Sequence, residues 1–127
     1  MAFRNSRISL NRGAFRKLEQ AQIRALEKTA EYVHTEVQQA QVMPRDTGAL
    51  QNENTYVDYS ALSSGTCSVV SSTPYARRLY FHPEYHFSKE ENPNAGGKWF
   101  EPWSDRGDKA ADVKKAYAAF YRQEAGT

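Results

Sequence analysis

The sequence predicts an α+β fold in which a long N-terminal helix and a C-terminal helix pack on a small antiparallel β-sheet. Three patterns indicate this class. Residues 14–41 have an uninterrupted helical periodicity, two short segments then alternate polar and apolar side chains, and residues 105–124 return to helical spacing. The 127 residues fit one domain, which we place at residues 13–127, after a basic arm at residues 1–12.

The long helix is predicted from Ala14 to about Gln41, a stretch without Gly or Pro, with Asn11 placed to cap it. Its apolar residues recur mostly at steps of three, four and seven, which is typical of one buried stripe. The stripe consists of Phe15, Leu18, Ala25, Leu26, Ala30, Val33, Val37 and Ala40. Such a helix is roughly 40 Å long. We expect it to pack across the sheet; the alternative is that part of its surface faces a partner.

Residues 52–60 and 66–73 are predicted to be strands, because both alternate and both contain β-branched residues. Residues 63–65, Ser-Ser-Gly, lie between them. The two segments therefore predict a β-hairpin or two neighbouring antiparallel strands. The residues expected on one side of the first strand are Thr55, Val57 and Tyr59.

A short helix is predicted after the hairpin. Thr73 can serve as its N-cap, and Pro74 suits the first helical position. The side chains of Arg77 and Arg78 are expected to point away from the core. The face expected to be buried consists of Tyr75, Ala76, Leu79 and Tyr80.

The rest of the chain is predicted as loop, strand and helix. Residues 82–97 contain prolines, glycines and asparagines that break any regular pattern. Residues 98–103 are predicted as a short edge strand, since their proline excludes a central one. A helix is expected at residues 105–124, with Ser104 or Asp105 as its cap. Its residues at helical spacing are Val113, Tyr117, Phe120 and Tyr121.

The net charge is +2, from 17 basic and 15 acidic residues, which is too balanced to indicate nucleic-acid or membrane binding by charge alone. The N-terminus differs, because no acidic residue precedes Glu19. The basic residues before it are Arg4, Arg7, Arg12, Arg16 and Lys17. The arm is predicted to contact phosphate or an acidic neighbouring surface; the alternative is a solvated terminus.

The single cysteine, Cys67, excludes an intrachain disulfide and fits a reducing compartment. It falls in the second predicted strand, so we expect a buried structural thiol. No apolar run approaches the roughly 20 residues that span a bilayer, and the N-terminus lacks the apolar segment of a signal peptide. We therefore expect a chain that is made in a cytoplasm and has no membrane partner.

No arrangement of residues indicates catalysis, a metal ion or a cofactor, and we expect none of these. His82 and His86 are spaced like zinc ligands on a helix, but a proline stands between them and no third ligand is near. Gly96 and Gly97 lack the following Lys-Ser/Thr of a phosphate-binding loop, and no GxSxG turn is present. The spacing of the candidate carboxylates in the sequence does not indicate a nuclease site. They are Asp46, Asp58, Glu84 and Glu101.

Aromatic and basic residues interleave between Tyr75 and Trp103. Such a stretch can stack nucleic-acid bases, or it can form a protein interface, where Tyr, Trp and Arg contribute much of the binding energy. Four glutamates dilute its positive charge, which favours a protein partner. The candidate interface residues are Arg77, Arg78, Tyr80, Tyr85, Phe87, Trp99, Phe100 and Trp103.

Residues 44–50, PRDTGAL, predict a turn that ends the long helix. The proline stops the helix, the aspartate can accept hydrogen bonds from the next backbone N–H groups, and the glycine can adopt a positive φ. The leucine then anchors the first strand in the core. The DTG sequence is therefore predicted to be a folding device and not a catalytic motif. The residues of this structural turn are Pro44, Asp46, Thr47, Gly48 and Leu50.

Two segments resemble a phage protein family. The turn PRDTGAL is similar to the P-x-D-T-G-x-L turn after the first long helix in minor capsid and tail-completion proteins of tailed bacteriophages. Residues 74–81, PYARRLYF, and the aromatic, Asn-Pro-rich stretch that follows resemble the PYA segment of minor capsid proteins. The order of elements is the same, and the resemblance covers residues 12–124. The segment from Gln51 to Asn54 departs from it, since family members have a Ser soon after the Leu.

The resemblance implies a structural protein of the virion, assembled in the host bacterial cytoplasm and located at the head–tail junction of a siphovirus. It implies an oligomeric ring around the DNA channel, with six-fold symmetry favoured over twelve-fold. The implied partners are other copies and the adaptor, stopper, tail terminator or tail tube. The long helix and the segment 99–103 are candidates for contacts within the ring, and the loop 82–97 for docking on the next ring. The candidates for contact with channel DNA or an adjacent protein are Arg4, Arg7 and Arg12.

Three alternatives stay open. In the first alternative, the chain is a head-completion stopper or a tail terminator instead of a tail-completion protein, because all three are small α+β ring subunits. Outside the phage class, it is a nucleic-acid-binding module that uses residues 75–103, which predicts steeply salt-dependent DNA affinity. The third is a small metal-dependent hydrolase built on His82 and His86, against which the missing third ligand argues.

Overall fold

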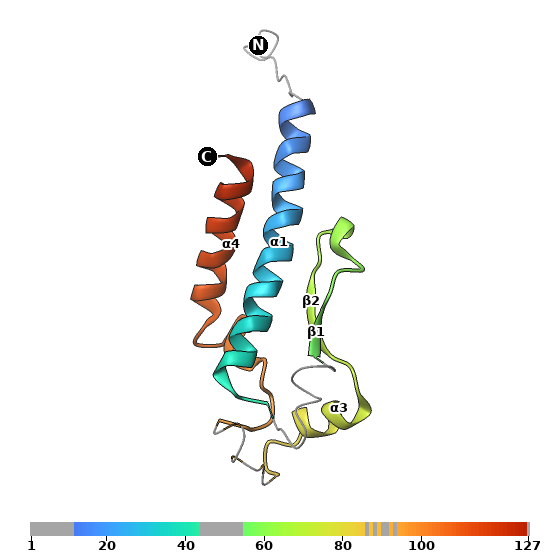
Figure 1. The fold of residues 1–127 in the computed structure, drawn as a ribbon, viewed down its shortest axis with the longest axis vertical. Helices are drawn as coiled ribbons and strands as arrows, with labels where there is room; N and C mark the ends of the chain where they lie inside the picture. The colour runs from blue at the N-terminus through green and yellow to red at the C-terminus, as the bar shows by residue number, and fades with distance from the viewer. Residues whose placement is uncertain are drawn as a thin grey trace, which may run out of the picture.

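The computed structural model describes residues 12–43, 55–85, 87, 89, 92 and 94–126. Its elements in chain order are α1 (Arg12–Ala40), β1 (Thr55–Asp58), the 3-10 turn η2 (Leu62–Ser64), β2 (Ser68–Ser71), α3 (Pro74–Tyr80), the 3-10 turn η3 (Glu101–Trp103) and α4 (Ala110–Ala125). Helix α1 forms the long axis, with α4 antiparallel along one side and the β-hairpin along the other (Figure 1). The predicted α+β class, with two helices and a small antiparallel sheet, is confirmed.

Helix α1 has 29 residues and matches the predicted span closely. It buries small side chains, which lets α4 and the hairpin approach it closely. Leu18, expected in the buried stripe, is instead exposed, because the described residues of the first two turns of α1 all face solvent. The helix ends at Ala40, and the next residue, Gln41, has a left-handed φ of 55°. The buried residues of α1 are Ala21, Ala25, Thr29, Ala30 and Val37.

The predicted hairpin is confirmed, but its strands have four residues each. Thr55 pairs with Ser71 and Asp58 pairs with Ser68. Gly65 has a φ of 87° and its N–H donates to the carbonyl of Leu62, which closes the turn between the strands. Tyr59, predicted to lie on the same side of the first strand as Thr55, follows β1 and is exposed, whereas Thr55 is buried.

Helix α3 begins as predicted, because the Ala76 N–H donates to Thr73 Oγ1 over 3.0 Å. Ala76 and Leu79 are buried, and Tyr80 is half-buried. The prediction for Tyr75 was wrong, since its side chain is 54% exposed. The buried face is narrower than expected because α3 has only seven residues.

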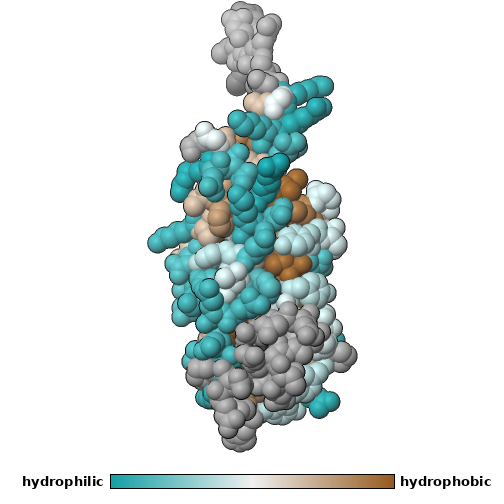
Figure 2. All heavy atoms as spheres, in the orientation of Figure 1, coloured by the Kyte–Doolittle hydropathy of each residue, from teal (hydrophilic) through white to brown (hydrophobic). Residues whose placement is uncertain are grey.

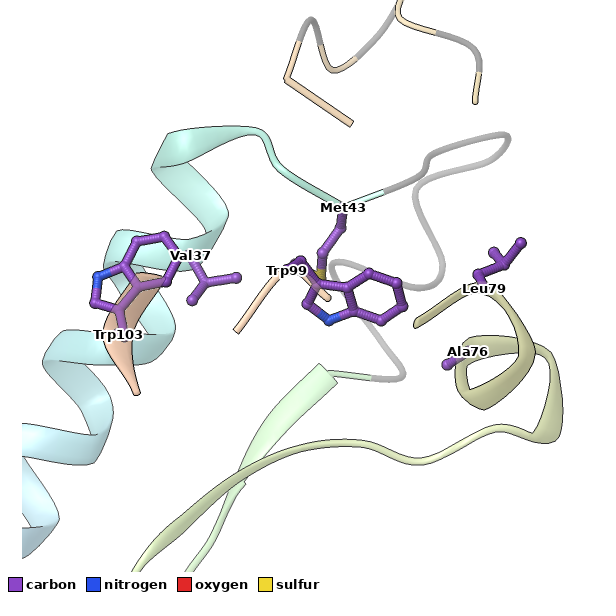
Figure 3. Packing of buried hydrophobic residues seen from close by; sticks show 6 residues of the cluster. All are labelled: Val37, Met43, Ala76, Leu79, Trp99 and Trp103. Carbon is purple, nitrogen blue, oxygen red and sulfur yellow. The ribbon is translucent and has the colours of Figure 1, made fainter. Parts of the chain in front are cut away.

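The main core lies where α1 ends and α3 and the last loop meet. Figure 3 shows Trp99 beneath Met43 and facing Ala76 of α3, while Trp103 lies beside Val37 of α1. The indole Nε1–H of Trp99 donates to Ser71 Oγ over 3.3 Å, which attaches the loop to β2. The core cluster consists of Val37, Met43, Ala76, Leu79, Trp99 and Trp103.

Two asparagines of the last loop join it to the end of α1. Asn92 is buried and donates from Nδ2 to the Met43 carbonyl over 2.8 Å. Asn94 is exposed and donates to the Ala40 carbonyl over 2.9 Å. At Gly97 a Cβ atom would lie 2.9 Å from the Cα of Pro83, so this close approach requires glycine.

The segment 98–103 and the start of the last helix differ from prediction. The segment is a turn followed by η3, and not an edge strand. Helix α4 starts at Ala110 and has no side-chain cap, so neither Ser104 nor Asp105 caps it. The reason is a second turn, in which the Lys109 N–H donates to the Pro102 carbonyl over 2.8 Å.

Candidate interaction surfaces

Two residues proposed from sequence as interface residues belong to the core. Trp99 is 2% exposed and Trp103 is 8% exposed. The interface prediction for this pair is therefore corrected. Aromatic side chains offer a large contact area in cores and in interfaces alike. Which of the two a tryptophan occupies depends on the neighbouring residues that pack around it. Here α1, α3 and the strand end supply those neighbours.

The remaining predicted interface residues lie on or near α3. Arg77, Arg78 and Tyr85 are exposed, while Tyr80, Phe87 and Phe100 are half-buried. Two aromatic residues outside the prediction join this surface. Tyr75 was expected in the core, and Phe81 is 61% exposed directly after α3. Neither arginine forms an ion pair with any residue that the structure describes.

A pocket of about 240 Å³ opens between α3 and the residues before η3. Tyr80 forms its aromatic wall, with its ring 4.9 Å from that of Trp99 and 5.1 Å from that of Phe81, both edge to face. Burial, and then the charge of Glu101, raises the pKa of Tyr80, so its hydroxyl stays neutral. We call this the α3 pocket. Its lining residues are Ser71, Ala76, Arg77, Tyr80, Phe81, Trp99 and Phe100.

His82 pairs with a carboxylate and an aromatic ring. Its Nδ1 lies 2.8 Å from Glu84 Oε1, and its ring stacks on Tyr85 with the centroids 4.6 Å apart. The hydrogen bond from His82 lowers the pKa of Glu84. His86 lies outside the described residues. Within the described part of the chain, no three side chains of the His, Cys, Asp and Glu types come together as metal ligands do.

A second surface, which the sequence analysis did not single out, lies beside the hairpin turn. Glu27 and Glu31 are one helical turn apart on α1, and α1 contacts β1 and η2. Burial raises the pKa of Tyr59, and the charges of Glu31 and Glu27 raise it further. We call Glu27, Glu31, Asp58 and Tyr59 the acidic patch. The i, i+4 spacing of the glutamates is visible in the sequence, but their distance from Tyr59 depends on how the hairpin packs.

Cys67 lies next to this patch and is half-buried, less than predicted. Its Sγ donates to the Asp58 carbonyl over 3.6 Å. Burial, with Glu27 as the next cause, raises the pKa of its thiol. The thiol is therefore a poor nucleophile at neutral pH, and the prediction of a structural role remains the best interpretation.

An apolar groove of about 300 Å³ runs between α1, β2, η3 and α4. Polar side chains cover most of the viewed face of the molecule, and its most apolar residues form small patches (Figure 2). The groove contains no charged residue, which distinguishes it from the α3 pocket. Its lining residues are Leu26, Thr29, Ala30, Val33, Cys67, Val69, Phe100, Trp103, Ser104 and Val113.

Several predicted residues lie outside the described part of the chain. Of the arm, Arg12 alone is described; it is exposed and belongs to α1, so the helix begins inside the predicted arm. Besides His86, the residues outside the description include the predicted helix cap Asn11, the arm residues Arg4 and Arg7, and the turn residues Pro44, Asp46, Thr47, Gly48 and Leu50.

Comparisons of the chain with known protein families, with curated proteins and with solved structures find no match. Among the described helices, none combines the length and the apolar character needed to cross a bilayer. The features that bear on function are therefore the fold, the α3 pocket, the acidic patch and the two sequence segments.

Proposed function

We propose that this chain is a structural subunit of a tailed-phage neck, which forms a ring around the DNA channel and joins the tail to the portal and adaptor proteins. The proposal rests on the resemblance of PRDTGAL and PYARRLYF to segments of minor capsid and tail-completion proteins. The order of the described elements, a long helix, a hairpin, a short helix and a last helix, is compatible with it.

The observation that carries the proposal is the surface around α3. Arg77 lines a pocket with aromatic walls, the exposed Arg78 follows it in α3, and neither forms an ion pair with a described residue. These residue types dominate the binding energy of protein interfaces. The segment that forms this surface is also the segment that resembles minor capsid proteins. An assembly subunit uses such a surface to bind its neighbour.

The same surface supports a protein partner better than a nucleic acid. Trp99 and Trp103 are buried, so they are not available to stack on bases. The nucleic-acid alternative predicts an affinity for DNA that falls steeply with salt. Fluorescence anisotropy of labelled DNA at several salt concentrations measures this, and we expect only weak binding. The stopper and tail-terminator positions remain alternatives within the proposal.

The proposal is tested by deleting the gene from the phage that encodes this chain. We expect lysates with filled heads and separate tails, because the joint between them is missing. Adding the purified protein to such a lysate is expected to restore joined, infectious particles. Joined particles in the deletion lysate would contradict the proposal, whatever the oligomeric state of the free protein.

A further inference from the structure

The acidic patch and the α3 pocket lie at opposite ends of the hairpin. Tyr59 and Asp58 are at the turn end of β1, whereas α3 follows the other end of β2 (Figure 1). One molecule therefore cannot bring its own patch to its own pocket, because the length of the hairpin separates them. A contact between these two surfaces requires two molecules.

The two surfaces carry opposite charges, and neither set is ion-paired within the part of the chain that the structure describes. Arg24 and Lys28, the cations on the same part of α1, both pair with Glu124 of α4, at 3.8 Å and 2.5 Å. Glu27 and Glu31 have no ion pair with any described residue. Arg77, which lines the α3 pocket, and Arg78, the next residue of α3, likewise have no ion pair with any described residue. Two unpaired carboxylates on one surface thus match two unpaired guanidinium groups on the other.

The apolar parts of the two surfaces also match. Tyr59 is 45% exposed and stands at the hairpin turn with carboxylates nearby. The α3 pocket holds about 240 Å³, less than the roughly 300–1,000 Å³ of small-molecule sites. It is therefore the size of a site for one side chain, and its walls are aromatic. Arg77 at its edge can contact the face of an entering ring.

We propose that Tyr59 of one copy enters the α3 pocket of the next copy, with Glu27 and Glu31 facing Arg77 and Arg78. This contact is heterologous, since different surfaces meet, and repeated heterologous contacts give a closed ring or an open filament. A symmetric pairing of either surface with itself is unfavourable, because like charges would face each other. The inference deepens the proposed function by naming the partner and both surfaces.

Charge reversal gives a direct test by native mass spectrometry and sedimentation of purified protein. The wild-type chain is expected to self-associate at low salt and to dissociate as salt rises. The R77E/R78E variant has two acidic surfaces, and the E27K/E31K variant has two basic ones. Each variant alone is expected to be monomeric, whereas an equimolar mixture is expected to form alternating oligomers with even numbers of chains. The chain that carries all four changes should self-associate again.

Matched variants control for charge and folding. K114E/K115E makes the same charge change as R77E/R78E on exposed residues of α4, and D105K/D108K matches E27K/E31K on exposed residues before α4. Both are expected to associate like the wild type. Tyr59→Ala is expected to weaken association at least about ten-fold, as loss of a buried aromatic anchor does. Tyr56→Ala, at a similarly exposed position of β1, should have little effect.

A wild-type chain that stays monomeric at high concentration and low salt would overturn the inference. So would a mixture of the two charge variants that fails to associate while each remains folded by circular dichroism. Either result leaves the neck proposal standing, because the α3 pocket would then serve a different neck protein. Joined heads and tails in the deletion lysate would instead contradict the neck role and not the contact between copies.

Discussion

The two ends of the molecule are held together in different ways. At the end where α1 stops, large side chains and buried hydrogen bonds tie a loop-rich segment around Trp99 and Met43. Toward the other end, α1 and α4 pack through small side chains such as Ala21 and Ala125, with ion pairs to Glu124 at the edge. We infer that most of the folding stability resides at the tryptophan end, which leaves the surface of the helical end free for polar contacts.

The largest expected effect is that of Trp99→Ala. Removing a fully buried indole costs the transfer free energy and leaves a cavity, so the free energy of unfolding should fall by about 3–5 kcal/mol. Urea denaturation followed by circular dichroism measures the change. Tyr75→Ala, on the exposed side of α3, should change it by less than about 0.5 kcal/mol. Equal losses in both variants would show that the indole is not central to the core.

Asn92→Ala tests the hydrogen bonds at the same end. The variant leaves the buried Met43 carbonyl without this donor, so we expect a loss of about 1–3 kcal/mol in the free energy of unfolding. Asn94→Ala is the matched control, because its side chain makes the same type of bond to the Ala40 carbonyl but is exposed. Water can replace that bond, and the control should lose less. A larger loss for Asn94→Ala than for Asn92→Ala would show that the buried hydrogen bond is not the more stabilising of the two.

Thr73→Ala tests how much the N-cap hydrogen bond stabilises α3. Loss of the hydrogen bond from the Ala76 N–H to Thr73 Oγ1 should cost about 1 kcal/mol. Ser72→Ala changes the exposed neighbour and should be close to neutral. Thermal unfolding of the two variants compares them. An unchanged melting temperature for Thr73→Ala would mean that α3 is held by packing alone.

The smallest effect is expected at the helical end, from Glu124→Gln. The hydrogen bond from Lys28 lowers the pKa of Glu124. A carboxyl with a lower pKa in the folded state stabilises that state above its unfolded pKa, and this contribution is lost as pH falls through the folded pKa. The variant should therefore have a slightly lower melting temperature than the wild type at pH 7, and the difference should shrink as pH falls from 4.5 through the lowered pKa of Glu124. A difference in melting temperature that grows as pH falls would contradict the stabilising role of the ionised Glu124. Glu19→Gln on the exposed start of α1 is the control.

Local signals were sufficient for much of the fold. The periodicity of α1, the hairpin and the Thr73–Pro74 start of α3 depend on neighbours in sequence, and all three were predicted. The start of α4 was not, because it depends on a bond from Lys109 to the Pro102 carbonyl across two successive turns.

The surfaces were harder to predict. The tryptophans were assigned to an interface because their residue type fits both environments, and only the packing of α1 and α3 around them places them inside. Arg77 and Arg78 were correctly expected to point away from the core, and both are exposed although they stand between the buried Ala76 and Leu79 in the sequence of α3. The acidic patch was missed because Tyr59 and the glutamates of α1 are distant in sequence, and only the packing of the hairpin on α1 brings their elements together.

The most direct test of the proposed neck role is cryo-electron microscopy of intact particles of the phage that, on this proposal, encodes the chain. We expect a ring of density at the head–tail junction into which α1, α4 and the hairpin fit, with the turn of one hairpin against α3 of the next subunit. Infectious particles that lack this chain at the junction would contradict the proposal.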